Sequence, residues 1–371
     1  MTAATPIIQF GTSRFLQAHA DLFISDAMAE GQAVGPITVV QTTGAAERSG
    51  RLAAFNGRPI PILIRGLEGG RPVERTEYTR SIVRGLSALA DREEVERVFV
   101  EEAGTVISNT GDGGYAGASE ETVGEEIPRS FPAKLTKLLA ARWLRNGAPM
   151  TLFPCELVNS NGAVLSGLCA DIARRSQLPA AFVDWLTQDC VWANSLVDRI
   201  VSGALEPAGA IAEPYALWAI EIRPGLAMPC RHRHVSPVDD LRVNERLKLF
   251  ILNLGHTCLA ERWIADRRPE RETVKQILAD PAMRAYLDEI HLGEVLPVMA
   301  AAGIAEAPAY RATVIERFLN PFLEHRMADI AMNHAAKKER RIGGLLKLAA
   351  EVGPAMALPT LRRLAQSGIG G

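Results

Sequence analysis

The chain has 371 residues, and its 41 basic and 43 acidic side chains leave a formal net charge of −2 at pH 7. This balance argues against a protein that binds nucleic acid or a membrane surface through a polybasic patch. With 47% hydrophobic residues, no apolar run near the roughly 18 residues of a membrane helix and no signal-peptide pattern, the sequence favours a soluble protein of about two domains.

The first 43 residues predict a strand, a helix and a second strand. Residues 6–11 are an apolar run that ends at a glycine, and apolar side chains then recur at helical spacing over residues 14–29. A β-branched run follows at residues 37–43. We interpret this segment as a βαβ unit, in which the two strands are parallel.

The alternation of strands and helices continues to about residue 240. Further strands are predicted at residues 60–64, 79–86, 105–111 and 150–155, and helices at residues 91–100, 132–143 and 162–174. Such alternation is typical of a parallel sheet with crossover helices. Beyond residue 240 the strand signals fade, and periodic stretches at residues 244–263, 272–290 and 310–341 predict helices. The sequence therefore predicts an α/β domain at residues 1–240 and a mainly α-helical domain at residues 241–371.

The turn Gly11-Thr12-Ser13-Arg14 between the first strand and helix is the first candidate site. In a Rossmann-like dinucleotide-binding domain, glycines in this turn let the backbone approach the pyrophosphate. Here only Gly11 is present, and Ser13 stands where a second glycine is usual. An ordinary strand-to-helix turn is therefore an alternative.

The end of the second strand does not decide between NAD and NADP. An acidic residue there would bind the adenosine ribose, but the strand ends Gln41-Thr42-Thr43. Arg48 and Arg51 could contact a 2′-phosphate, although exposed arginines early in a helix are more often only solvated. Both cofactors remain open at this point.

The second candidate site is the set Lys248, Asn253 and His256 in RLKLFILNLGHT. At about 100° per residue, Asn253 and His256 lie roughly 140° and 80° around a helix from Lys248, so all three share one broad sector. Flanking apolar residues would favour the neutral amine that a general base needs. Asn253 could donate to a developing alkoxide, and His256 could orient a substrate oxygen. The alternative is a lysine that extends from an amphipathic helix, with a core asparagine and histidine bonded to nearby carbonyls.

Motifs spread over most of the chain resemble those of the polyol-specific long-chain dehydrogenases, the mannitol dehydrogenase family. In chain order they are FGTSRFLQAH (residues 10–19), SNTGDGGY (108–115), SFPAKLTKLL (130–139), NSLVDRIV (194–201), K-x4-N-x2-H (248–256) and RFLNP (317–321). Their common order makes the resemblance far more specific than any one motif.

The resemblance implies metal-independent hydride transfer between the nicotinamide and a secondary alcohol or ketone. It makes Lys248 the general base, Asn253 the group that polarises the carbonyl and His256 the ligand of the reacting oxygen. It also implies NAD as the cofactor, with NADP not excluded. The expected cofactor-binding residues are Gly11, Thr12, Ser13, Arg14, Phe15, Gln41, Ser108, Asn109 and Thr110.

The chain departs from the mannitol-type pattern after the strand at residues 150–155. Mannitol-type members have a C-D-N segment whose asparagine is a second oxyanion donor, whereas this chain reads Cys155-Glu156-Leu157. Leu157 cannot donate, and Asn159 or Asn161 could replace it. The P-C-E-L form followed by N-G is similar to the hexuronate branch, the tagaturonate and fructuronate reductases, whose substrates carry a carboxylate.

A carboxylate substrate needs a cation, and the fork of arginine suits it best. Arg231 in CRHRH and Lys337, by a loose match after RFLNP, are the expected substrate-binding cations. A run such as KKERR is more often a solvated helix face. Asp198 matches a family residue of the substrate and cofactor cleft, with an ion pair to Arg199 as the alternative.

No metal site is expected. The H-x-H pair in CRHRH has no third ligand nearby, and the five scattered cysteines form no C-x-x-C pair. This cysteine usage indicates a reducing, cytoplasmic location without a disulfide frame.

Together these observations predict an oxidoreductase that interconverts a keto sugar acid and its secondary alcohol. The alternatives are a mannitol or hexitol-phosphate dehydrogenase and a non-catalytic dinucleotide-binding protein. The expected partner is a small sugar acid or polyol, with no nucleic acid and no membrane, and the chain is expected to be a monomer or a small homo-oligomer.

Overall fold

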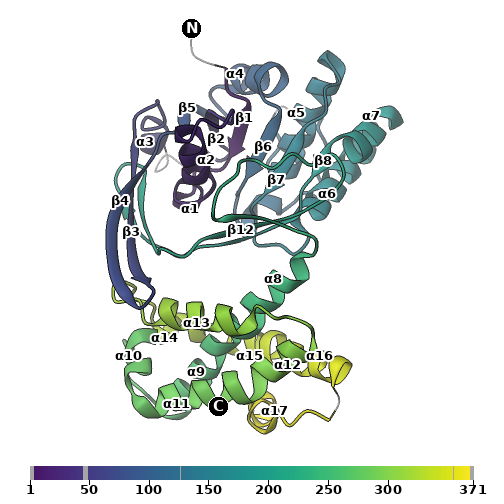
Figure 1. Cartoon of the computed structure of the whole chain (residues 1–371). Coiled ribbons are helices and arrows are strands. Elements are labelled where there is room, and N and C mark those ends of the chain that lie inside the picture. Colours follow the sequence, from purple (N-terminus) through teal and green to yellow (C-terminus); the bar gives the residue numbers. More distant parts are fainter. Residues whose placement is uncertain (1–3, 45–48, 126, 354, 368–371) are drawn as a thin grey trace. The chain divides into compact units, whose positions relative to one another are not determined.

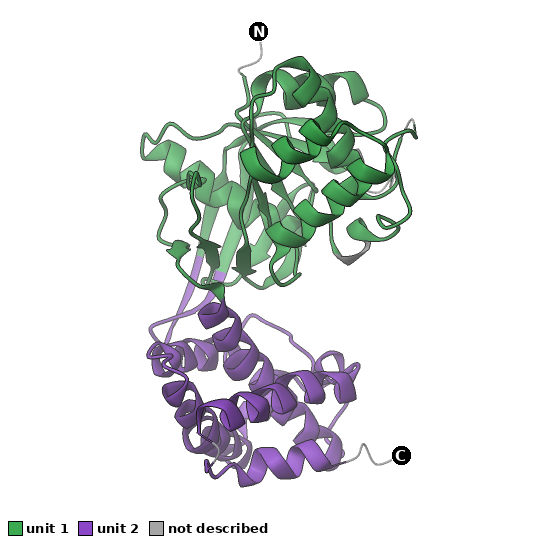
Figure 2. Cartoon of the chain, turned by 90° about the vertical axis from the view of Figure 1, so that its right-hand side faces the viewer, with its two compact units in different colours: residues 1–64, 75–241 green, residues 65–74, 242–371 purple. Residues whose placement is uncertain are grey.

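The computed structural model describes residues 4–44, 49–125, 127–353 and 355–367 (Figure 1). The chain divides into two compact units (Figure 2). Unit 1 contains residues 1–64 and 75–241, and unit 2 contains residues 65–74 and 242–371. Within the described ranges, no helix has the length and apolar character needed to cross a bilayer.

The centre of unit 1 is a parallel sheet in which six strands of the described chain take part. Their order is β5 (Ile82–Ser87), β2 (Ile37–Gln41), β1 (Ile7–Phe10), β6 (Thr105–Ser108), β7 (Thr151–Pro154) and β8 (Val191–Trp192). Every residue of β1 and β2 is buried, which explains their continuous apolar and β-branched sequences. Phe10 pairs with Val40 and with Ser108, so β2, β1 and β6 end at the same edge. The predicted βαβ unit is confirmed.

Helices cover both faces of this sheet. Ile7 packs in one hydrophobic cluster with Leu16 and Phe23, whereas Ile8 packs in another with Leu135 and Leu165. The helical segments of unit 1 are α1 (Arg14–Gln17), α2 (Ala20–Ala29), α3 (Ser49–Leu52), α4 (Arg92–Arg97), η2 (Val98–Glu102), η3 (Asp112–Tyr115), α5 (Phe131–Arg145), α6 (Asn161–Arg175), α7 (Ala180–Asp184) and η4 (Trp185–Asp189). Alternate residues of β1 thus face opposite layers, as in a doubly covered Rossmann-like sheet.

Other strands form two smaller sheets. One has the order β10 (Val201–Leu205), β11 (Gly209–Ala212), β3 (Ile60–Glu68) and β4 (Arg71–Thr79), and the other has the order β13 (Val235–Val238), β12 (Leu217–Glu221) and β9 (Ser195–Asp198). The strand expected at residues 60–64 is therefore not part of the parallel sheet, because it pairs with β11 through Ile62 and Ile64. The stretch at residues 79–86 is likewise split, since β4 ends at Thr79 and β5 begins at Ile82.

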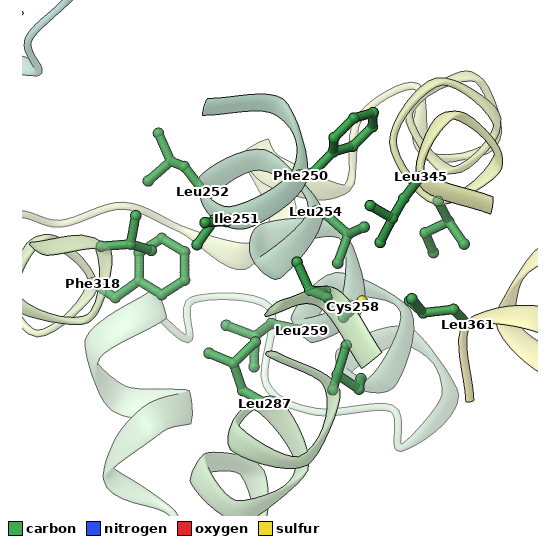
Figure 3. Close-up of a cluster of buried hydrophobic side chains, with 14 of the residues drawn as sticks. Phe250, Ile251, Leu252, Leu254, Cys258, Leu259, Leu287, Phe318, Leu345 and Leu361 are labelled. Atoms are coloured by element: carbon green, nitrogen blue, oxygen red, sulfur yellow. The ribbon is translucent and has the colours of Figure 1, made fainter. Parts of the chain in front are cut away.

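Unit 2 is mainly helical, as predicted, and is built around one hydrophobic cluster. Its helical segments are α8 (Leu241–Leu247), η5 (Lys248–Asn253), α9 (Leu254–Ala265), α10 (Val274–Ala279), α11 (Pro281–Ile290), η6 (His291–Val295), α12 (Leu296–Ala301), α13 (Ala307–Phe318), α14 (Met327–Ala331), α15 (His334–Lys338), η7 (Glu339–Gly343), α16 (Gly344–Val352) and α17 (Pro359–Gln366). Figure 3 shows Ile251, Leu254 and Leu259 among the buried side chains of this cluster. One face of the helix at residues 241–265 thereby forms the core of the unit.

Two of the predicted long helices are interrupted. The stretch at residues 272–290 breaks at Asp280, whose carboxylate accepts from Ala282 N (2.9 Å) and begins α11. The stretch at residues 310–341 breaks after Phe318, where Asn320 Oδ1 accepts from Phe322 N (2.9 Å) around Pro321. Proline lacks the N–H that a helix interior requires, and a preceding Asp or Asn caps a new turn.

Candidate active site

A pocket of about 230 Å³ lies in unit 1 at the carboxyl ends of β1, β2 and β6. Its lining consists of Gly11, Thr12, Ser13, Gln41, Thr42, Thr43, Arg51, Asn109, Thr110 and Gly111. The chain runs from β1 to β2 on one side and returns to β6 on the other. This change of direction is the switch point at which open parallel sheets bind their ligands.

Gly11 sets the shape of this pocket. Its φ is +116°, a conformation that L side chains rarely adopt. A Cβ at this position would lie 2.3 Å from Asn109 O, so the turns after β1 and β6 can approach this closely only with glycine. The bare backbone and the open carboxyl edge fit a dinucleotide, which needs close contact between its phosphates and the main chain.

Ser13, which replaces the usual second glycine, links the two turns. Its Oγ accepts from Leu16 N (3.3 Å) and donates to Asn109 Oδ1 (3.3 Å). On the other wall, Arg51 Nη1 donates to Thr12 O (2.6 Å). Arg48 lies outside the described residues.

The structure places three of the predicted cofactor residues outside the pocket lining. Arg14 Nη1 donates to Leu205 O (2.9 Å) and its Nη2 to Glu206 (2.6 Å), so its side chain holds the turn between β10 and β11. The Phe15 ring stacks on His19 at 4.7 Å. Ser108 is buried and donates to Glu156. The described contacts of these three side chains are thus with other parts of unit 1, and their role in cofactor binding stays a prediction.

The expected cofactor-binding residues did not include Thr42, Thr43 and Gly111 of the lining, and Arg51, also in the lining, was considered only as a contact of a 2′-phosphate. Thr42 and Thr43 come directly after β2, and Gly111 comes shortly after β6, two strands that the sequence predicted. The rule that all loops at the carboxyl edge share one crevice could have found them.

In unit 2, Lys248 and Asn253 are the first and last residues of a π-helical turn, η5, between α8 and α9. The prediction of a helix over residues 244–263 is confirmed, but the 100° spacing used within it is wrong for this turn. In a π-helix residue i bonds to residue i+5, so residues five apart lie on the same side. The K-x4-N spacing therefore brings Lys248 and Asn253 together, and both are half-buried.

Arg341 satisfies the carbonyl at the end of this wide turn. Its Nη1 donates to Asn253 O (3.1 Å) and to Thr257 Oγ1 (2.9 Å). The side-chain amide of Asn253 makes no hydrogen bond with the described part of the chain, so it is available to a ligand.

His256 is only 7% exposed and lies between two rings. The centroid of Phe318 is 4.3 Å away and that of His325 is 4.9 Å away. Burial holds the pKa of His256 well below its ordinary value, and the nearby His325, Arg341, Arg317 and Lys337 lower it further. Its Nε2 has no hydrogen-bond partner within the described residues. A neutral imidazole of this kind can bind an oxygen atom but is not suited to carry a charge.

The three predicted substrate-binding residues have different environments. Lys337 lies on α15 near this histidine and donates to Ile330 O (2.8 Å), and burial lowers its pKa. Asp198 is buried at the end of β9 in unit 1, while Arg199 donates to Glu213 O (3.0 Å) and Ala18 O (2.6 Å).

Arg231 is exposed, and its main chain pairs with the side chain of Gln32 (2.9 and 2.7 Å). Gln32 follows α2 and precedes β2, at the edge of the sheet opposite to the pocket. This position does not support the substrate role that was predicted for Arg231.

The segment after β7 provides no second oxyanion donor at Asn161. The amide of Asn161 donates to Pro154 O (2.9 Å), Glu156 O (3.1 Å) and Ser195 O (3.0 Å), so its donors are used within the fold. Leu157 is 75% exposed and Asn159 is exposed. Within the described residues, no group of three or more His, Cys, Asp or Glu side chains is placed to hold a metal ion.

Comparison with known proteins identifies the family. Residues 72–227 match the family model of the mannitol dehydrogenase Rossmann domain, and residues 240–357 match that of the mannitol dehydrogenase C-terminal domain. The altronate oxidoreductase of Klebsiella pneumoniae is 32% identical over 361 residues, which cover 91% of this chain and 73% of the relative. The chain belongs to the mannitol dehydrogenase family. It is accordingly an oxidoreductase that acts on CH–OH groups.

A further relative and two solved structures are also similar to this chain. The altronate oxidoreductase of Halalkalibacterium halodurans is 29% identical over 359 residues, which cover 91% of this chain and 69% of the relative. The fold matches a crystal structure of D-sorbitol dehydrogenase with a TM-score of 0.80 at 20% identity, over 93% of this chain and 76% of that one. It also matches mannitol 2-dehydrogenase of Pseudomonas fluorescens, in a complex with NAD and D-mannitol, with a TM-score of 0.75 at 18% identity, over 95% of this chain and 76% of that one. The family resemblance and the fold class predicted from the sequence motifs are confirmed.

Proposed function

We propose that this member of the mannitol dehydrogenase family interconverts a keto-hexuronate and the corresponding aldonate, using NAD or NADP. The relatives named altronate oxidoreductase support an aldonate as the substrate class. The dinucleotide would be held by the pocket around Gly11, Ser13 and Asn109. When bound, it supplies or accepts the hydride.

The observation that carries the proposal is the charge around His256. The cations Lys337, Arg341 and Arg317 all lie close enough to this buried histidine to lower its pKa. Arg341 is half-buried, and its Nε and Nη2 make no hydrogen bond with the described part of the chain. Partly desolvated cations favour an anionic ligand, and a guanidinium matches a carboxylate through two parallel hydrogen bonds. A neutral hexitol would leave this charge uncompensated.

The proposed roles of the unit 2 residues follow from their chemistry. In oxidation, the neutral amine of Lys248 takes the hydroxyl proton as the hydride leaves carbon, and in reduction its ammonium returns a proton to the oxygen. The Asn253 amide donates to the oxygen as negative charge develops on it. The neutral His256 Nε2 hydrogen-bonds to the same substrate and fixes its orientation. None of these steps requires a metal ion.

A steady-state absorbance assay tests the proposal. The purified chain is given NADH or NADPH with tagaturonate, fructuronate, fructose or fructose 6-phosphate. We expect one of the keto-uronates to have the highest kcat/KM. Turnover of fructose or its phosphate alone would move the protein to the polyol branch, and silence with all four substrates would remove the proposal.

A pair of neighbouring arginines sharpens the assay. Arg341→Gln should lower kcat/KM for the keto-uronate about 100-fold more than for fructose, because a buried charge-assisted contact is lost. Arg340→Gln is the matched control, since Arg340 is exposed on the same helical turn. Equal losses for both substrates would mean that Arg341 supports the helix and does not recognise the carboxylate.

A further inference from the structure

Glu156 is a buried carboxylate at the edge of the sheet that carries the dinucleotide pocket. It is the second residue after β7 and is 5% exposed. Its Oε2 accepts from Ser108 Oγ (3.0 Å), and its Oε1 accepts from Thr110 N (3.1 Å) and Thr110 Oγ1 (3.3 Å). One carboxylate thus holds the segment after β6 on both sides of Asn109.

Asn109 connects this segment to the turn after β1. Its Nδ2 donates to Cys155 O (2.7 Å), and its Oδ1 accepts from Ser13 Oγ (3.3 Å). Its main-chain oxygen occupies the position that a side chain at Gly11 would need. Asn109 and Thr110 both line the pocket. A shift of residues 108–110 would therefore change their distance from the Gly11 turn, and with it the shape of the pocket that is to hold the dinucleotide.

Glu156 and Glu102 both accept two hydrogen bonds from a threonine, but only Glu102 also has cationic partners among the described residues. Burial raises the pKa of Glu156, the hydrogen bonds from Thr110 and Ser108 oppose this, and no Lys or Arg of the described chain forms an ion pair with it. At the opposite edge of the sheet, Glu102 accepts from the N (2.7 Å) and Oγ1 (2.9 Å) of Thr5. Glu102 also bonds to Arg84 and Arg97 (2.8 and 2.7 Å). Burying a carboxylate without a cationic partner costs free energy. Because Glu156 lies beside the pocket, we expect the function that justifies this cost to concern the pocket.

We infer that Glu156 is a positioning residue for the dinucleotide, because it holds residues 108–110 in the conformation that fits against the Gly11 turn. The inference rests on the proposed function only in requiring that this pocket binds NAD(H) or NADP(H). Glu156 acts through Ser108 and Thr110 and is not assigned a contact with the cofactor.

The test measures dinucleotide binding directly. The full chain is titrated with NADH and with NADPH by fluorescence, and its thermal unfolding is recorded in parallel. In Glu156→Met the side chain keeps its length but accepts no hydrogen bond, so Kd should rise about tenfold or more. In Glu156→Gln the amide oxygen still accepts from Thr110 and the amide nitrogen can donate to Ser108 Oγ, so Kd should stay within about threefold of wild type.

Glu102→Met is the matched control, because it removes the same pair of threonine hydrogen bonds at the other edge of the sheet. It should lower the unfolding temperature and leave Kd unchanged. Equal Kd values in Glu156→Met and wild type would overturn the inference, as would equal weakening in Glu156→Met and Glu102→Met.

Two further outcomes keep the test decisive. If the wild type binds neither NADH nor NADPH, it is the proposed function that fails. If Glu156→Met does not fold, Ser108→Ala replaces it, since this change removes one donor and leaves the Thr110 N–H paired. Its Kd should rise about fivefold or more, and a Kd within about threefold of wild type would again overturn the inference.

Discussion

The candidate sites of the two units are built from different material. In unit 1 the pocket is formed mostly by main chain and short side chains that follow β1, β2 and β6, and its shape depends on the absence of a side chain at Gly11. In unit 2, long polar side chains of one helix are proposed to carry the chemistry, with Lys248 and Asn253 aligned by a π-helical turn. Substitutions in unit 1 should therefore change binding, and those in unit 2 should change turnover.

The strongest test of this division is Lys248→Ala. Loss of the general base should lower kcat by about 100- to 10,000-fold, while Kd for the dinucleotide stays unchanged. Steady-state kinetics and fluorescence titration measure the two quantities. Lys347→Ala is the control, because Lys347 is exposed on α16. Comparable kcat values in wild type and Lys248→Ala would remove the assignment of Lys248 as general base.

The next effect in size is expected for Asn253→Ala. If its amide stabilises the developing oxyanion, the transition state loses about 2.7 to 4 kcal/mol and kcat falls about 100- to 1,000-fold. The control is Asn244→Ala, since Asn244 is also half-buried and lies on α8, earlier in the same continuous helix. An unchanged kcat would assign Asn253 to packing.

Gly11→Ala tests the unit 1 side of the comparison. The new Cβ would meet Asn109 O, and the positive φ would add strain of about 1 to 3 kcal/mol. Dinucleotide affinity should fall at least tenfold, measured by titration. Gly31→Ala is the control, because Gly31 also has a positive φ (+82°) but nothing lies within 4 Å of its Cβ position. If both variants lose the same affinity, backbone strain and not the close approach to Asn109 sets the pocket.

An effect on stability and not on the candidate sites is expected from Asp21 on α2, whose buried carboxyl lies against Gln9 of β1. Burial raises its pKa from 3.8 to about 7, although Gln9 donates to it at 3.2 Å. Between these pH values the folded chain keeps a proton that the unfolded chain has lost. The contribution of Asp21 to the free energy of unfolding is therefore fully present below about pH 4. It is lost as the pH rises through 7, by up to about 1.4 kcal/mol per pH unit.

The variant Asp21→Asn should remove this slope. Calorimetric melting between pH 5 and 8 would show a smaller fall of Tm with pH than in wild type, because other titrating groups are common to both proteins. Parallel curves for the two proteins would contradict the buried, protonated state of Asp21.

Much of the architecture was readable from local patterns. The β-branched and apolar runs at β1, β2 and β6 predicted strands, and helical periodicity predicted the mainly helical unit 2, because burial on a strand or a helix leaves a mark at fixed spacing. The motifs around Gly11 and Lys248 predicted the family. The interruptions at Asp280 and Pro321 were also visible in the sequence, but the periodic pattern continued through them and concealed the breaks.

The π-helical turn and the separate sheet that contains β3 could not be read in this way. A hydrophobic period of 3.6 residues does not distinguish an α-helix from one with a single widened turn. The partner of β3 depends on β11, which lies far along the chain. In both cases local propensity was compatible with more than one arrangement, and tertiary packing selected one.

The sequence by itself determined the family, the residues proposed to carry chemistry and the kind of domain on which each lies, because side-chain type and hydrophobic spacing are local properties. Only the tertiary structure decided how those residues are supported. Glu156 meets Thr110 across 46 positions, and Arg341 meets Asn253 across 88. Such contacts form only when strands or helices distant in sequence close on one another, and no local pattern encodes that closure.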